Sequence, residues 1–227
     1  MSSVQTYGVL LASAHPADRR RLALFAFSTL IVVAAALAAH MLYEYNHLSS
    51  EKFSLNRDHG YAEIVQYILV VIAAVALVTI AHARRQAAYA LLSAMMAYLF
   101  ADDVFCIHEK VGEFLALNYP LMTPFDVEPA HAGEALYLGA VASIFLILLV
   151  ILFAKASSKT RIDIAAFTAL LILAGVFGIV GDVAHAAIGN KPAAMIEDGG
   201  ELISVALLSI FSVDRALASS RNGAFYD

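Results

Sequence analysis

The chain has 227 residues, of which 61% are hydrophobic and 15% charged, and its mean hydropathy is +0.77. Soluble domains average about 45–50% apolar and about 25% charged residues, so this composition excludes an ordinary soluble protein and indicates an integral membrane protein. The net charge of −5 gives no support for a nucleic-acid partner, and the single cysteine excludes an intrachain disulfide framework. At this length we expect one polytopic membrane domain over residues 1–227.

Uncharged apolar stretches predict an all-α fold with six transmembrane helices, because a spanning helix needs about 20 apolar residues. We expect these helices near residues 22–43, 61–82, 86–109, 132–154, 162–186 and 194–214. Three arginines precede the first helix and small residues end it, as in a cleaved signal peptide. Its apolar run exceeds the roughly 7–15 residues usual for such a peptide, so we expect it to be retained.

The positions of Lys and Arg predict that both termini are cytoplasmic. All but four of the fourteen lie before the first helix, between the second and third, between the fourth and fifth, or after the sixth. By the positive-inside rule these segments face the cytoplasm. All but four of the nineteen acidic residues lie towards the other side. Because acidic residues contribute little to topology, the positive-inside rule does not explain why they gather on one side. Their distribution needs a separate explanation. The expected location is a bacterial inner membrane with the acidic residues facing outward.

The length of the last predicted helix places carboxylates inside the membrane. Only 12 uncharged residues separate Glu201 from Asp214. At 1.5 Å per residue they cover about 18 Å of a hydrocarbon core of about 30 Å. The helix can cross only if it begins near Ala194, and this start submerges Glu197, Asp198 and Glu201.

The third predicted helix also places carboxylates inside the membrane, although its uncharged stretch falls short of the hydrocarbon thickness by less. Its uncharged stretch at 86–101 covers about 24 Å. Asp102 and Asp103 are therefore drawn below the outer boundary of the membrane. His108 and Glu109 follow one to two turns further out, near the surface.

The fourth and fifth helices carry similar groups at their outer ends. His131 and Glu134 are an i, i+3 pair, and so are Asp182 and His185. Residues at this spacing share a helix face. The two helices run in opposite directions, so both pairs place the carboxylate deeper than the histidine. We expect these side chains to converge on one site.

Internal similarity indicates a weak repeat of a two-helix hairpin. Three inward-running helices begin alike, with HGYAEIVQYIL (59–69), HAGEALYLGA (131–140) and GGELISVALL (199–208). Two outward-running helices end alike, with DDVFCIHEKVG (102–112) and GDVAHAAIG (181–189).

Glu63 and Glu134 lie near the outer headgroups, where a solvated role is as expected as a functional one.

Submerged carboxylates at this density need metal ions or shared protons to neutralise them. An ionisable group inside the membrane costs at least about 2.5–3.5 kcal/mol on insertion scales. Only Lys110 and Lys191 are near, and both are expected in loops. We therefore predict divalent metal, one ion or two, with iron, zinc or manganese favoured because carboxylates outnumber histidines. The predicted metal-binding residues are Asp102, Asp103, His108, Glu109, Glu134, Asp182, His185, Glu197, Asp198 and Glu201.

The favoured hypothesis is a membrane-embedded metalloenzyme, a hydrolase or an oxidoreductase, that acts on a lipid, quinone or other lipophilic substrate. The alternatives are a cation or proton transporter that uses the same cluster, and a non-catalytic subunit of a membrane complex. The expected partners are membrane lipids and the substrate, with another membrane protein or a second copy left open. Few hydroxyls lie in the inner helix halves, which favours a one-sided site over a transport path. The loop at 110–130 is either a lid or a plain connector.

Several other polar side chains have simpler interpretations. We expect interfacial or loop positions for His40, His47, His59 and His82. We expect packing or interfacial positions for Tyr61, Tyr67, Tyr98 and Tyr137, and packing for Cys106.

Overall fold

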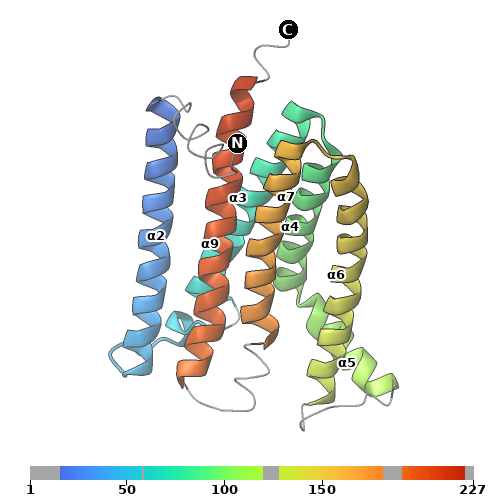
Figure 1. The fold of residues 1–227 in the computed structure, drawn as a ribbon. Helices are drawn as coiled ribbons and strands as arrows, with labels where there is room; N and C mark the ends of the chain where they lie inside the picture. Colours follow the sequence, from blue (N-terminus) through green and yellow to red (C-terminus); the bar gives the residue numbers. More distant parts are fainter. Residues whose placement is uncertain (1–15, 58, 120–127, 181–190, 223–227) are drawn as a thin grey trace.

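The computed structural model describes residues 16–57, 59–119, 128–180 and 191–222, without the side chains of 179–180, 191–194 and 221–222. Over these residues the chain is all-helical (Figure 1). Within the described ranges six helices are long and apolar enough to cross a membrane, which confirms the predicted number. The elements are α2 (Pro16–Glu44), η1 (Glu51–Phe53), α3 (Tyr61–Arg84), α4 (Ala87–Phe105), α5 (Ile107–Asn118), α6 (Pro129–Lys155), α7 (Ser158–Gly175), the π-helical turn η3 (Val176–Val180) and α9 (Lys191–Asn222).

The long helices run alternately up and down in one bundle, so α2 begins and α9 ends at the same end of the molecule (Figure 1). Helix α9 packs against α2, α3 and α7, and α3 also packs along α4. Helix α6 contacts the rest of the bundle mainly through the short helix α5. The spanning helices α3, α4 and α9 are therefore the centre of the fold.

Burial along the helices distinguishes the protein core from the lipid-facing surface. Of the apolar window of α9, 44% is buried, whereas only 6% of the corresponding window of α6 is. The core joins Leu77 of α3, Met96 of α4 and Leu208 of α9, all at most 2% exposed. Large apolar side chains such as Ile144 and Ile147 point outward from α6. An exposed apolar surface of this extent requires a hydrocarbon environment.

Local sequence explains several helix boundaries. Pro129 occupies the first turn of α6, where its missing N–H costs nothing. The Ser157 hydroxyl accepts a hydrogen bond from the Thr160 N–H and caps the start of α7. Arg85 adopts the left-handed conformation, with φ of 51°, and ends α3 one residue before the N-cap of α4.

The structure differs from the predicted helix over 86–109, because the chain breaks at Cys106. This residue has φ of 48° and ψ of 50°, and it separates α4 from α5. Helix α5 then occupies much of the predicted loop at 110–130, of which residues 120–127 lie outside the described part of the chain. Lys110, expected in a loop, lies in α5, where its Nζ donates to the Phe105 carbonyl at 2.7 Å.

Candidate metal centre

A cavity of about 210 Å³ lies where the start of α3, the end of α4, the start of α5 and the first half of α9 meet. Five carboxylates and one imidazole contribute to its wall. The lining residues are Leu55, Asn56, Arg57, Ala62, Glu63, Gln66, Asp103, His108, Glu109, Asp198, Glu201 and Leu202. We call this end of the bundle, which is the lower end in Figure 1, the acidic end.

Both carboxylate oxygens of Glu63 accept hydrogen bonds, one from α3 and one from the residues just before it. The Tyr67 hydroxyl donates to Oε1, and the backbone N–H of His59 donates to Oε2. Tyr67 follows Glu63 by four residues, so the two side chains share a helix face. The Tyr67 ring packs edge-on against Phe100 of α4, with the ring centroids 5.8 Å apart. Glu63 is thus fixed in the first turn of α3, at the wall of the cavity.

The break at Cys106 turns His108 back towards Asp102. In a continuous α-helix, residues six apart are separated by about 9 Å along the axis and about 240° around it. Here His108 Nδ1 lies 2.8 Å from Asp102 Oδ2. A non-glycine residue in the left-handed region costs of order 1–3 kcal/mol, and such residues cluster at functional sites. The strained backbone at Cys106 therefore serves to assemble this group.

Two consecutive glycines let α9 approach its neighbours beside Glu201. A Cβ on Gly200 would lie 2.3 Å from the Phe177 ring of the π-helical turn, and one on Gly199 would lie 3.0 Å from Leu37 of α2. The Glu201 side chain then reaches α3, where Gln66 Nε2 donates to its Oε1 at 2.9 Å. The sequence GGE therefore places a carboxylate at the centre of the bundle.

The structure gathers half of the predicted metal-binding residues around this cavity. Those that line it are Asp103, His108, Glu109, Asp198 and Glu201. Asp102, Asp103 and His108 each offer a ligand atom, and these three atoms lie within 4.8 Å of one another. Asp102 itself is 1% exposed and lies behind the wall.

The other predicted residues have different positions. Glu197 is buried on α9, one turn before Glu201, and is not part of the lining. Glu134 is also absent from the lining; its Oε2 lies 3.3 Å from His131 Nδ1 on its own helix. Asp182 and His185 lie outside the described residues.

Some residues of the site were not among the predicted ligands. Glu63 lines the cavity, and its resemblance to Glu201 in the repeated helix starts was the available signal. Gln66 had no signal, because its role depends on the packing of α3 against α9. His40, expected at an interface, is 2% exposed, and its Nδ1 accepts the Leu55 N–H at 3.1 Å. His40 thereby anchors the loop that carries Leu55, Asn56 and Arg57 to the cavity.

At the opposite end of the bundle, ion pairs and hydrogen bonds around Asp163 join four helices. Its Oδ2 accepts hydrogen bonds from Arg84 at 3.0 Å and from the Tyr89 hydroxyl at 2.7 Å, and its Oδ1 lies 3.5 Å from Arg215. These residues come from α7, α3, α4 and α9. We call this end the arginine end.

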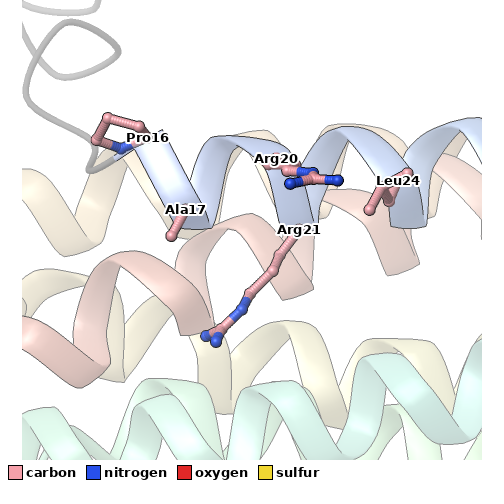
Figure 2. A pocket seen from close by; sticks show the side chains of 5 residues that line it. All are labelled: Pro16, Ala17, Arg20, Arg21 and Leu24. Atoms are coloured by element: carbon pink, nitrogen blue, oxygen red, sulfur yellow. The ribbon is translucent and has the colours of Figure 1, made fainter.

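A larger hollow, of about 490 Å³, also lies at the arginine end, along the start of α2 (Figure 2). Its lining consists of Pro16, Ala17, Arg20, Arg21 and Leu24. It offers no carboxylate, imidazole or thiol, and the cavity at the acidic end is therefore the candidate site despite its smaller size.

The donor set of the acidic cavity suits a hard or borderline cation. Carboxylate oxygens with one imidazole nitrogen bind manganese, iron or zinc. A structural zinc site would use cysteine thiolates, and the chain has one cysteine. The lining residues therefore fit a carboxylate and histidine site better than a structural zinc site.

Comparison with known proteins identifies a family without a described activity. No curated protein and no solved structure matches the chain. Residues 23–214 match the family described as a domain of unknown function, DUF8692, and the chain belongs to that family.

Proposed function

We propose that this protein is a membrane-embedded metalloenzyme whose divalent ion or ions bind in the acidic cavity. The observation that carries the proposal is the convergence of Glu63, Asp103, His108 and Glu201 from four helices on one cavity. Three of these helices are candidate membrane spans. Ionisable side chains within a span are expensive and mark function by default.

The charge of the cavity supports a bound cation. Its five lining carboxylates face one lining cation, Arg57. The Arg57 side chain is 59% exposed and forms a long 3.9 Å pair with Glu51. An exposed pair of this kind contributes little, so Arg57 does not neutralise the interior of the cavity. Grouped carboxylates must share protons or bind a cation to offset their desolvation cost, and a divalent ion supplies the compensating charge.

The volume of the cavity supports an enzyme rather than a closed storage site. Water occupies about 30 Å³ per molecule in the liquid, so 210 Å³ holds an ion together with water or part of a substrate. A bound metal of this type activates water or polarises a substrate oxygen. Because the walls belong largely to spanning helices, the proposed substrate is a lipid, a quinone or another lipophilic molecule that reaches the membrane boundary.

The arginine end weighs against a transport path. A transporter needs a polar route from the cavity to the opposite end, and Asp163, Arg84 and Arg215 lock the helices together there. The excess of Lys and Arg at that end supports a cytoplasmic position for it and an outward-facing acidic cavity. Metal or proton flux in proteoliposomes, driven by an imposed gradient, would favour a transporter over a metalloenzyme.

Metal analysis of the purified protein tests the proposal. The protein is extracted without chelator, and iron, manganese and zinc are measured against protein concentration. We expect at least one equivalent of one of these metals. A content below about a tenth of an equivalent would overturn the proposal, because a site that supports turnover must be occupied.

A further inference from the structure

A chain of hydrogen bonds runs from the cavity to helix α6. His108 Nδ1 lies 2.8 Å from Asp102 Oδ2. The Tyr98 hydroxyl lies 3.2 Å from Asp102 Oδ1 and 2.9 Å from the Tyr137 hydroxyl. These four side chains come from α5, α4 and α6, and among them His108 lines the cavity.

The direction of the hydrogen bond between His108 and Asp102 follows from the proton count. An ionised carboxylate only accepts, so Asp102 accepts from both His108 and Tyr98. A phenol has one proton, and the Tyr98 hydroxyl has two acceptors within reach, Asp102 Oδ1 and the Tyr137 hydroxyl. His108 therefore carries its proton on Nδ1. In the neutral imidazole, the lone pair is then on Nε2.

We propose that Asp102 is a positioning residue and not a metal ligand, and that it presents His108 Nε2 to the ion in the acidic cavity. This inference rests on the proposed metal site. It separates two adjacent aspartates by role: Asp103 lines the cavity and binds the ion, whereas Asp102 is 1% exposed behind His108. A carboxylate that accepts the second N–H of a ligating histidine fixes its orientation and raises its basicity.

Tyr98 completes the arrangement by donating to the second oxygen of Asp102. A buried carboxylate oxygen without a donor is costly, and Tyr98 supplies the donor four residues before Asp102 on the same helix. The Tyr137 hydroxyl of α6 is the second acceptor within reach of the Tyr98 hydroxyl. Tyr98, expected to be a packing or interfacial residue, thus helps to hold the carboxylate that orients the histidine.

The first experiment titrates metal-free protein with Co²⁺ and follows its visible spectrum, using Zn²⁺ competition for affinity. We expect Asp103→Asn and His108→Ala to remove the high-affinity site. We expect Asp102→Asn to keep the stoichiometry, weaken binding by about 10–100-fold and shift the Co²⁺ bands. Tyr98→Phe should weaken binding by less than Asp102→Asn. Glu113→Gln, an exposed carboxylate on α5, is the control and should bind as the wild type does.

A double variant best distinguishes a positioning role of Asp102 from a role as a metal ligand. In a His108→Ala background, the residual affinity for Co²⁺ should not change when Asp102→Asn is added, because a positioning residue acts only through the histidine. A further loss of affinity in the double variant would overturn the inference and leave the metal site standing. Loss of all stoichiometric binding in Asp102→Asn alone would also overturn it.

A second readout does not depend on metal. In ¹⁵N-histidine-labelled, metal-free protein, the His108 resonances should show Nδ1 protonated and Nε2 free. Asp102→Asn should remove this preference, and Tyr137→Phe should preserve it. A wild-type His108 protonated on Nε2 would overturn the inference even if metal binds. A wild type with the expected tautomer that binds no metal would instead overturn the proposed function, and with it the assignment of Nε2 as a ligand.

Discussion

Gly112 of α5 and Gly133 of α6 lie in direct backbone contact. A Cβ on Gly133 would come within 2.5 Å of the Gly112 carbonyl oxygen, and one on Gly112 would lie 2.5 Å from Cγ of Glu134. Close approach at small residues is the usual way in which membrane helices associate. This contact fixes the position of α5 against α6. Helix α5 carries His108 and Glu109, so the contact also helps to fix where these two residues lie.

Gly133→Ala should separate α5 from α6 and destabilise the protein by about 1–3 kcal/mol, as overpacking does. The matched control is Gly139→Ala, because a Cβ at that position on the same helix meets nothing within 4 Å. Thermal unfolding in detergent measures both. Equal stability of the two variants would contradict the close contact.

Cys106 should accept glycine better than any β-branched residue. Its φ of 48° lies in the left-handed region, which glycine adopts at no steric cost. We expect Cys106→Gly to retain the fold and metal binding, and Cys106→Val to lower stability by of order 1–2 kcal/mol. Stability and Co²⁺ titration of the pair provide the measurement. A valine variant as stable as the glycine variant would argue against the break between α4 and α5.

Asp163→Asn should destabilise the arginine end without changing the metal site. Removing one partner from a buried ion pair costs about 3–5 kcal/mol, because the other charge stays buried. The Asp163 side chain is 4% exposed. Glu51→Gln breaks an exposed pair and should cost under about 1 kcal/mol. Unfolding and metal content are measured for both; metal loss in a folded Asp163→Asn variant would show that the two ends are coupled.

Glu201→Gln should lower metal content while the protein still inserts and folds. The substitution keeps an oxygen that can accept from Gln66, so the link between α3 and α9 remains. It removes the charge that a divalent ion requires. Metal analysis and thermal unfolding of purified protein test this, with Glu113→Gln as the control. Full occupancy in Glu201→Gln would remove Glu201 from the ligand set.

Chelation should lower the thermal stability of the wild type. A ligand that binds only the folded state stabilises it by RT ln(1 + [L]/Kd), about 2.7 kcal/mol at 100-fold excess over Kd. Removing metal with a chelator should lower the melting temperature, and re-addition of the native metal should restore it. The Asp103→Asn variant should not respond. An unchanged wild-type melting temperature would argue against a folded-state site.

The length of the uncharged apolar runs was enough to predict six spanning helices, because lipid requires long apolar runs and they leave a strong signal in the sequence. The short apolar run after Glu201 also indicated correctly that α9 begins well before that residue. The break at Cys106 had no signal, because a left-handed cysteine depends on its tertiary surroundings. Arg84 and Asp163, 79 residues apart, were expected to lie at the same side, but their pairing depends on how α3 and α7 pack.

The sequence predicted the chemical type of the candidate site better than it predicted which residues line the cavity. Helix length placed Asp102, Asp103 and Glu201 inside the membrane but could not say which face each side chain occupies. Asp102 and Asp103 are neighbours on α4 and face about 100° apart, so the rotation of α4 decides which of them lines the cavity. The absence of Glu134 from the lining depends in the same way on how α6 packs against α5. Both depend on contacts between helices, which residue spacing does not encode.

The packing of α3 against α9 has a consequence for the order in which the protein is made. Glu63 and Asp103 emerge from the ribosome long before Glu201, because α3 and α4 precede α9 in the chain. The hairpin of α3 and α4 is therefore made before α9 can pack against its acidic groups, and ionisable groups on a spanning helix are costly without partners. Arrival of α9 completes the cavity wall, so the site is assembled only when α9 reaches the membrane.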